Sequence, residues 1–362
     1  MTLRLRVATR KGLFTLTHRS GKWQIGEPAF LGDPVSMMLD DPRDGTLYAA
    51  LNLGHFGVKL HRSRDAGGTW EELEAPTYPT QPEGAAGPPW KLVQIWSLEA
   101  GTTSEPGVLW AGTIPGGLFR SDDHGKTWQL NRPLWDCPDR LGWFGGGYDA
   151  PGIHSIIVDP RNGKRVALGI SCGGVWQTED GGGTWRNVAR GMRAGFMPPE
   201  QAGDPNIQDP HRVVASPGEP DTLWSQHHSG IFHRPAGAPE WNEITTAPIS
   251  NFGFAVASHP TDPKTAWFVP AMSDQKRVPV GGRLVVNRTR DGGRTFETLA
   301  KGLPQHACYD LVYRHGLDVD GTGRWLAVGS TSGGLWLSGD QGDSWESVAG
   351  NLPPVYAVRF AN

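Results

Sequence analysis

The sequence predicts an all-β chain folded as a seven-bladed β-propeller, and two repeated features lead to this prediction. The first is a turn motif, [Ser/Thr]-x-Asp-x-Gly-x-[Thr/Ser]-[Trp/Phe], which occurs five times. The second is a short apolar run that recurs in step with it and often ends in Asp-Pro or His-Pro. Repeats with a period of roughly 40–60 residues are typical of propellers and solenoids.

The spacing of the motif reveals two further, degenerate copies. The five complete copies are centred on Asp65, Asp123, Asp180, Asp291 and Asp340. The interval from position 180 to position 291 is about twice the others, and a copy that keeps its tryptophan but lacks the aspartate ends there at Trp241. Another degenerate copy ends at Trp23. The total of seven units gives about 52 residues per blade, which suits four strands and generous loops.

Each copy of the motif lies between two strand-like runs and therefore reads as a hairpin turn. The aspartate can accept hydrogen bonds from backbone N–H groups of the turn, as in Asx-turns. The glycine supplies a backbone conformation that other residues adopt at a cost. The final aromatic ring is large enough to pack between neighbouring sheets. These carboxylates are consequently expected to be structural, not catalytic.

The motif resembles the Asp-box, or BNR repeat, of sialidases and related β-propellers. That resemblance implies ligand binding on the face opposite the repeated turns. A true sialidase is not predicted, although Tyr309 and Tyr356 could be placed as the tyrosine nucleophile of that family. The family's Arg-Ile-Pro motif is absent from the sequence. Few arginines are expected at the mouth, whereas sialidases clamp a substrate carboxylate with three.

The two ends of the chain are expected to share one blade. The run Leu3–Ala8 at the N-terminus has the pattern of a second strand, whereas Val355–Phe360 has that of an innermost strand. The C-terminal strand should therefore complete the first blade and close the propeller, which leaves only short, protected edges. We expect residues 1–362 to form a single domain. Another innermost strand is expected at residues 308–313.

Composition restricts the classes of partner. The net charge of −3 gives no basic footprint for nucleic acid. The sequence contains no run of 18 apolar residues, so no membrane span is expected. The N-terminus lacks the apolar core of a signal peptide. The three cysteines show no paired spacing. Together these features favour a protein of the reducing cytoplasm.

Long connections between blades are expected to act as ordered lids, because loops above about 12–15 residues are usually functional or disordered. They cover residues 75–91, 131–152 and 189–210, and the sixth unit adds an insertion at 271–281. Four tryptophans lie in or beside them: Trp90, Trp96, Trp135 and Trp143. These rings either pack the lids onto the blades or stack on a ring-shaped ligand.

Alignment of the innermost strands places aromatic and imidazole side chains at the upper mouth of the channel, and the turns between second and third strands add more. Polar groups that converge on a concave surface mark a binding site. We therefore expect a small-molecule or carbohydrate-like ligand there. The predicted ligand-binding residues are His55, Trp96, His154, His211, His227, His228, Tyr309 and Tyr356.

Three functions remain open at this point. One is a hydrolase for a carbohydrate-like substrate; xyloglucanases resemble two such propellers joined and use paired aspartates, and the candidates here are Asp136, Asp149, Asp209, Asp274 and Asp310. A second is a protein- or peptide-binding scaffold, as the resemblance to the photosystem II assembly factor family and the sortilin ectodomain implies. A third is a metal enzyme with ligands among His154, His211, His227 and His228. Catalytic residues, reaction, cofactor and oligomeric state are not defined by the sequence.

Overall fold

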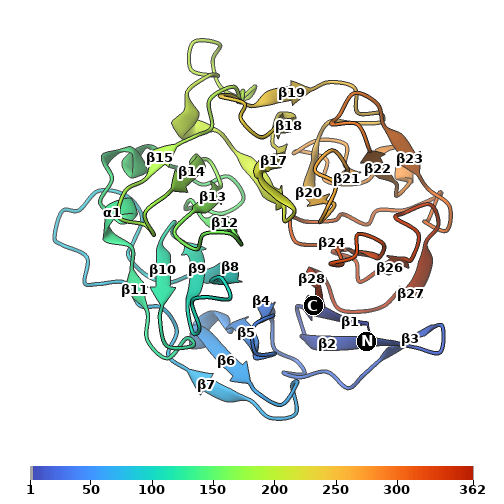
Figure 1. Ribbon diagram of the computed structural model, residues 1–362, viewed down its shortest axis with the longest axis horizontal. Helices are drawn as coiled ribbons and strands as arrows, with labels where there is room; N and C mark the ends of the chain where they lie inside the picture. The colour runs from blue at the N-terminus through green and yellow to red at the C-terminus, as the bar shows by residue number, and fades with distance from the viewer. Residues whose placement is uncertain (1–2, 362) are drawn as a thin grey trace. The chain divides into compact units, whose positions relative to one another are not determined.

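The computed structural model describes residues 3–361, which fold into seven four-stranded antiparallel sheets. This is the predicted seven-bladed β-propeller (Figure 1). The chain divides into two compact units, Met1–Val35 with His211–Asn362 as unit 1, and Ser36–Pro210 as unit 2. Each unit is described by itself. Within the described range, no helix is long and apolar enough to cross a membrane.

Unit 1 holds sheets one, five, six and seven. Neighbouring strands in the order given below are hydrogen-bonded to each other. Their bounds are β28 (Val355–Ala361), β1 (Arg4–Thr9), β2 (Gly12–Arg19) and β3 (Lys22–Ile25); β16 (Pro210–Ser216), β17 (Glu219–His227), β18 (Gly230–Arg234) and β19 (Asn242–Ile244); β20 (Gly253–Ser258), β21 (Ala266–Pro270), β22 (Val286–Thr289) and β23 (Glu297–Leu299); and β24 (Leu317–Val319), β25 (Leu326–Gly329), β26 (Leu335–Ser338) and β27 (Glu346–Ala349). A short 3-10 turn, η4 (Val280–Gly282), lies in the insertion of sheet six.

Unit 2 holds sheets two, three and four, again with sequential strand order. Their bounds are β4 (Val35–Asp40), β5 (Leu47–Asn52), β6 (Val58–Ser63) and β7 (Glu71–Leu73); β8 (Gln94–Ala100), β9 (Leu109–Ile114), β10 (Leu118–Ser121) and β11 (Gln129–Leu130); and β12 (Ile153–Val158), β13 (Val166–Ile170), β14 (Gly174–Thr178) and β15 (Arg186–Asn187). Helical structure is limited to η1 (Gly54–Phe56), α1 (Arg132–Trp135), η2 (Pro138–Gly142) and η3 (Pro205–Ile207).

The C-terminal strand completes the first sheet, as predicted. Strand β28, red in Figure 1, lies beside the blue β1, with Val7 opposite Val358 and Leu5 opposite Phe360. The backbone N–H of Phe360 also donates to the Asp318 carboxylate in β24, at 2.7 Å. Burial raises the pKa of this Asp318 carboxyl to about 6.

The prediction of an innermost strand at residues 308–313 is wrong. This segment has no regular structure, and the first strand of sheet seven is β24, which starts at Leu317. Residues 308–313 nevertheless bury three apolar side chains, Cys308, Leu311 and Val312. An apolar run in a loop that packs on a core looks like a strand when only hydrophobicity is read.

All five complete copies of the motif are hairpin turns between the third and fourth strands of a sheet, and we call them the repeat turns. In the first, Thr69 donates from its backbone N–H to Asp65 Oδ1 at 2.9 Å and from its hydroxyl to Oδ2 at 2.8 Å. The hydroxyl of Ser63 donates to Asp65 Oδ1 at 2.7 Å. Gly67 adopts the required left-handed conformation, with φ of 99°. The backbone N–H of Thr69 and the two hydroxyls hold the pKa of Asp65 at about 2.

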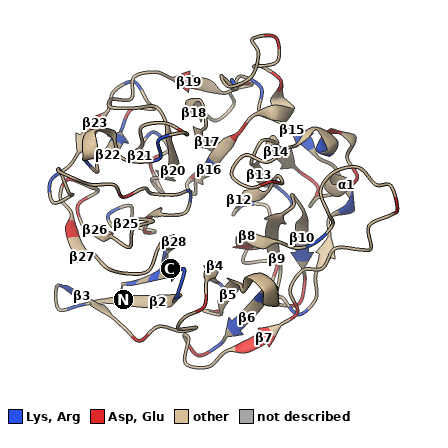
Figure 2. Ribbon diagram, turned by 180° about the vertical axis from the view of Figure 1, so that it is seen from behind, with Lys and Arg blue, Asp and Glu red and all other residues tan. Residues whose placement is uncertain are grey.

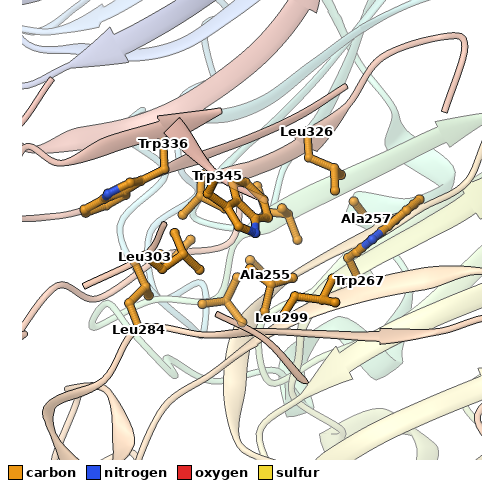
Figure 3. Packing of buried hydrophobic residues seen from close by; sticks show 14 of the residues in the cluster. Ala255, Ala257, Trp267, Leu284, Leu299, Leu303, Leu326, Trp336 and Trp345 are labelled. Carbon is orange, nitrogen blue, oxygen red and sulfur yellow. The ribbon is translucent and has the colours of Figure 1, made fainter. Parts of the chain in front are cut away.

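The ring that ends a repeat turn packs between neighbouring sheets. Figure 3 shows Trp345, from the turn of sheet seven, among Ala255, Leu303 and Leu326. Ala255 belongs to sheet six and Leu326 to sheet seven, so the ring joins the two sheets in one buried cluster. Burial of such a ring removes a large apolar area from water, which stabilises the contact between blades.

Charged side chains are exposed on most of the fourth, edge strands of the sheets. Figure 2 shows β7 in red, and this strand carries the exposed Glu71 and Glu72. Glu243 in β19, Glu297 in β23 and Glu346 in β27 are exposed in the same way. Charges on edge strands oppose pairing with the edges of other sheets.

Candidate functional site

Two of the predicted site residues meet at the start of the innermost strands of unit 2. The ring of Trp96, in β8, lies edge-on to that of His154, in β12, with centroids 5.5 Å apart. Both side chains are buried, His154 completely, and His154 Nδ1 shares a hydrogen bond with the Ser155 hydroxyl at 3.0 Å. His55 is exposed in η1, where its ring contacts Phe56.

The link between β11 and β12 covers this end of unit 2. Its helix α1 is capped by Asn131, whose side chain accepts a hydrogen bond from the backbone N–H of Leu134. Trp135 and Trp143 are both buried, and Trp143 Nε1 donates to Asn206 Oδ1 at 2.9 Å. Of the two roles predicted for these tryptophans, packing of the link onto the sheets is therefore the one that the geometry supports.

Residues 143–149 of this link, which we call the lid, present two aromatic rings to solvent. Phe144 is 37% exposed and Tyr148 is 43% exposed. The Tyr148 ring lies edge-on to Trp96, at 5.3 Å, and its hydroxyl donates to Gln94 Oε1 at 3.2 Å. The same Gln94 oxygen accepts a hydrogen bond from Asn52 at 3.3 Å. The lid thus places rings beside polar amides.

A buried carboxylate, Asp209, lies beneath the lid. Its Oδ1 accepts hydrogen bonds from the Ser171 hydroxyl at 3.2 Å and from the backbone N–H of Cys172 at 3.1 Å. The second contact stabilises Cys172 in a left-handed conformation, with φ of 46°. The glycine backbone approaches this group closely: a Cβ at Gly146 would lie 3.2 Å from Asp209 Oδ2 and 2.7 Å from Ser171 Oγ, so a side chain there would have to displace the Ser171 hydroxyl.

Unit 1 contains a second group of rings, which we call the imidazole cluster: His211, His228, Phe252 and Phe254. His211 stacks on Phe254 with centroids 4.4 Å apart, and it meets the His228 ring at 5.3 Å. His211 Nδ1 lies 2.6 Å from the carbonyl oxygen of Gly253. Because a carbonyl only accepts, Nδ1 carries the proton.

The insertion of sheet six adds charges to the imidazole cluster. Asp274 Oδ2 lies 3.6 Å from His228 Nε2. The guanidinium of Arg277 lies 5.5 Å from the Phe254 ring centroid, and Arg314 approaches the same ring at 5.5 Å. Cation–π contacts of this kind hold the insertion close to the cluster.

The three remaining predicted residues of unit 1, His227, Tyr309 and Tyr356, lie in three different segments of the chain. His227 is fully buried against Phe232, and its Nδ1 accepts a hydrogen bond from the backbone N–H of Ser229 at 3.0 Å. Tyr309 is 69% exposed in the loop before β24. Tyr356 is half-buried in β28, where burial raises its pKa.

The metal hypothesis stays a prediction. Within unit 1, His211 and His228 bring two imidazoles together, and neutral imidazole nitrogen is a good ligand for Zn²⁺ and related ions. Because His211 Nδ1 is turned to a backbone carbonyl, Nε2 would be its ligand atom.

Sequence reasoning missed Phe144, Gly146 and Tyr148 as site residues, and considered Asp209 only as one of several acids. A signal was present in the run Gly145-Gly146-Gly147-Tyr148 within a long link. Consecutive glycines allow close approach of the backbone to a buried group. The sequence did not reveal that Asp209, 63 residues after Gly146, lies beneath them.

Comparisons with known proteins relate the chain to enzymes that act on carbohydrates. It is 24% identical over 244 residues to the oligoxyloglucan-reducing end-specific xyloglucanase of Emericella nidulans, covering 63% of this chain. It is 32% identical over 85 residues, 23% of this chain, to a probable enzyme of the same name from Neosartorya fischeri. The chain spans only 27% and 9% of the length of these two relatives. No family model matches.

The fold has a similar solved structure. The GH74 xyloglucanase from Xanthomonas campestris superposes with a TM-score of 0.66 at 19% identity, and the match covers 96% of this chain and 52% of that enzyme. At this level of identity the likeness concerns the fold, and function must be argued from the site.

Proposed function

We propose that the chain is a carbohydrate-binding propeller with glycoside hydrolase activity, and that its sugar chain lies on the rings of Phe144 and Tyr148. One observation carries this proposal: two exposed aromatic rings lie on a lid whose glycine backbone covers a buried carboxylate, Asp209. The proposal draws support from the curated relatives, which are named as xyloglucanases.

The lid suits a sugar chain for a physical reason. Aromatic rings offer a flat apolar surface for the C–H face of a pyranose, and a tyrosine also has a polar end. Asn52 and Gln94 lie next to the Tyr148 hydroxyl and can exchange hydrogen bonds with sugar hydroxyls. An exposed ring that already leans on Trp96 loses little freedom when the ligand binds.

Hydrolysis would require two carboxyl groups, one to protonate the leaving oxygen and one to activate water or attack the sugar. Asp209 is one candidate because its side chain is fixed by Ser171 and Cys172. Asp149 is the other, because it is exposed at the end of the lid. We assign these two residues as the acid and base pair to be tested.

The repeat turns support a place for the chain among the Asp-box propellers of the sialidase-like superfamily, outside the true sialidases. In all five turns the aspartate accepts hydrogen bonds from the hydroxyl and backbone N–H groups that the motif supplies. These carboxylates are occupied within their own turns, which leaves the lid as the place for chemistry.

Binding is tested with xyloglucan oligosaccharides, and unbranched cello-oligosaccharides serve as the comparison, by isothermal titration calorimetry. Tyr148→Ala should weaken binding roughly tenfold, which corresponds to about 1.4 kcal/mol. Leu141→Ala is the matched control, because Leu141 is 60% exposed on the same link but lies outside the lid. Equal affinity of wild type and Tyr148→Ala would remove the binding site from the lid.

Hydrolysis is tested separately, by release of reducing ends. Asp209→Asn and Asp149→Asn should each abolish activity and retain binding. Asparagine at position 209 keeps an oxygen that accepts from Ser171 and Cys172, so the turn should stay folded. Full activity in both variants would show that the catalytic pair lies elsewhere, while binding at the lid would stand.

A further inference from the structure

A pocket of about 420 Å³ opens in unit 1 beside the repeat turn of sheet six, at the end of the sheets away from the imidazole cluster. A volume of this size suits a small molecule. Its walls come from sheet five and from the turns of sheet six. The lining residues are Glu219, Thr222, His233, Pro235, Ala236, Asn242, Ile244, Pro263, Lys264, Asp291, Gly292 and Arg294.

The pocket lies where sheet five departs from a pattern that sheets two and six share. In sheet six, Arg288 of the third strand lies opposite Trp267 of the second. Its guanidinium donates to Glu297 at 2.8 Å and to the carbonyl of Gln341 in the next repeat turn at 2.8 Å. In sheet two, Arg62 makes the same two contacts, with Glu71 and with the carbonyl of His124.

Sheet five replaces this ion pair with two neutral residues. His233 takes the position of the arginine, opposite Trp224, and Asn242 takes the position of the glutamate. The imidazole is shorter than a guanidinium and stacks on Trp224 with centroids 3.8 Å apart. The turn after it also lacks the aspartate, since Ala236 occupies that place. Both changes leave space that the arginine side chain fills in sheets two and six.

His233 lines the pocket with a ring nitrogen that has no hydrogen-bond partner in the described part of the chain. Burial lowers the pKa of His233 to about 4, so the ring is neutral at physiological pH. The side chain is 7% exposed, and its Nε2 has no hydrogen-bond partner among the described residues. A buried polar atom without a partner costs free energy, which a ligand hydroxyl that reaches it would recover.

Two cations at the rim, Lys264 and Arg294, have no ion-pair partner among the described residues. Both side chains are exposed. Asp291, on the same wall, is occupied by its own turn, with Thr295 and the backbone of Arg294 as donors. Glu219 has only a long contact of 3.4 Å from the Thr222 hydroxyl.

We propose that this pocket binds a small hydroxylated acid, of the chemical class of a sugar acid. Its anionic group would meet Lys264 and Arg294, since charge-assisted hydrogen bonds to oxyanions are the strongest available there. Its hydroxyls would meet His233, Asn242 and Glu219, and its apolar face would lie on Pro235, Pro263 and Ile244. The pocket belongs to unit 1 and the lid to unit 2. A negative result for this proposal therefore leaves the proposed hydrolase function unchanged, and the reverse also holds.

The test is calorimetric titration at pH 7 with three probes: glucuronate, glucose and inorganic phosphate. Glucuronate should bind saturably, and at least about tenfold more tightly than either glucose, which lacks the charge, or phosphate, which lacks the hydroxylated ring. The double variant Lys264→Gln/Arg294→Gln should lose glucuronate binding about tenfold or more. The double variant Arg19→Gln/Lys22→Gln removes two exposed cations from β2 and β3 and should bind as wild type does.

A second variant tests whether binding needs the empty volume of the pocket. His233→Arg restores the residue of sheets two and six and should fill the pocket, with loss of glucuronate binding and an unchanged or higher Tm. The proposal is overturned by any of three results: no saturable glucuronate binding at millimolar concentration, equal binding by the rim double variant, or glucose or phosphate binding as tightly as glucuronate.

Discussion

Sheets five and six of unit 1 differ in the turn that joins their third and fourth strands. In sheet six, Asp291 accepts hydrogen bonds from Thr289, Thr295 and the backbone of Arg294. In sheet five, the residues before Trp241 provide neither the aspartate nor its hydroxyl donors. Both turns nevertheless end in an aromatic residue, and Trp241 is 3% exposed. Both sheets therefore keep the aromatic ring that ends the turn, whereas sheet five lacks the carboxylate.

The other degenerate turn follows the same rule. In sheet one, the turn between β2 and β3 is reduced to Ser20 and Gly21, both with positive φ. Trp23 still packs edge-on against Trp325, the residue before β25 of sheet seven, with centroids 5.6 Å apart. Ring burial contributes to the contact between sheets, whereas the aspartate acts within its own hairpin. The two contributions can therefore be separated by mutation.

The largest loss of stability is expected for Trp241→Ala. Removal of a fully buried large ring costs about 3–5 kcal/mol of unfolding free energy, because apolar burial is lost and a cavity remains. The ring also lies 5.6 Å from the guanidinium of Arg234. Thermal or denaturant unfolding measures the loss. The half-buried Phe296, at the same position in sheet six, is the matched control.

Phe296→Ala should cost less than Trp241→Ala, since less area leaves water when Phe296 folds. An equal or greater cost for Phe296→Ala would contradict the view that the buried area of the ring sets its contribution to stability.

This comparison also explains how much of the fold the sequence could predict. The repeat turns, and even the degenerate ones, were recognisable because each turn is local and its Trp, Gly and Asp have fixed spacing. The strand β28 was recognisable because the chain would otherwise have one innermost strand too few. The false strand at residues 308–313 came from a loop whose Cys308 and Leu311 are buried by tertiary packing.

The candidate sites were less predictable, because burial depends on neighbours that are distant in sequence. The alignment placed His154, His211 and His227 together at one end of the innermost strands and turns, but all three are buried against other side chains. The exposed rings of Phe144 and Tyr148 lie in a link without periodicity. The pocket of sheet five follows from His233 in an arginine position, which becomes visible only when strand registers align the sheets.

A smaller effect is expected for Asp291→Ala. The variant leaves turn donors without their acceptor, but Arg294 and Thr295 are exposed, so water replaces much of what is lost. The expected cost is about 1 kcal/mol, close to that of losing a helix N-cap. Tm is the measurement, and carbohydrate binding at the lid should not change.

The reverse substitution, Ala236→Asp in sheet five, should give no gain in Tm. The hydroxyl positions of the motif are occupied there by Arg234 and Glu240, so the new carboxylate finds none of the donors that surround Asp291. A clear stabilisation by Ala236→Asp would show that the aspartate alone, without its partners, sets the turn.

The smallest effect is the pH dependence of the repeat turns. The hydroxyl and the backbone N–H of Thr295 hold the pKa of Asp291 at about 2, below the ordinary value of 3.8. A carboxyl with a lowered folded-state pKa binds its proton more readily in the unfolded chain. Its stabilisation is therefore complete above pH 4 and is lost as the pH falls from about 4 to about 2.

The lowered pKa of Asp291 predicts how the stability of its variants changes in acid. The Tm difference between wild type and Asp291→Ala should be constant from pH 7 to pH 5 and should shrink between pH 4 and pH 2, because the wild-type carboxyl becomes protonated and loses its charge-assisted bonds. Asp291→Asn keeps an acceptor without a titrating proton, so its difference from Asp291→Ala should not change with pH. If the wild-type difference stays constant down to pH 2, the charge of Asp291 contributes nothing, and the turn depends on hydrogen-bond geometry alone.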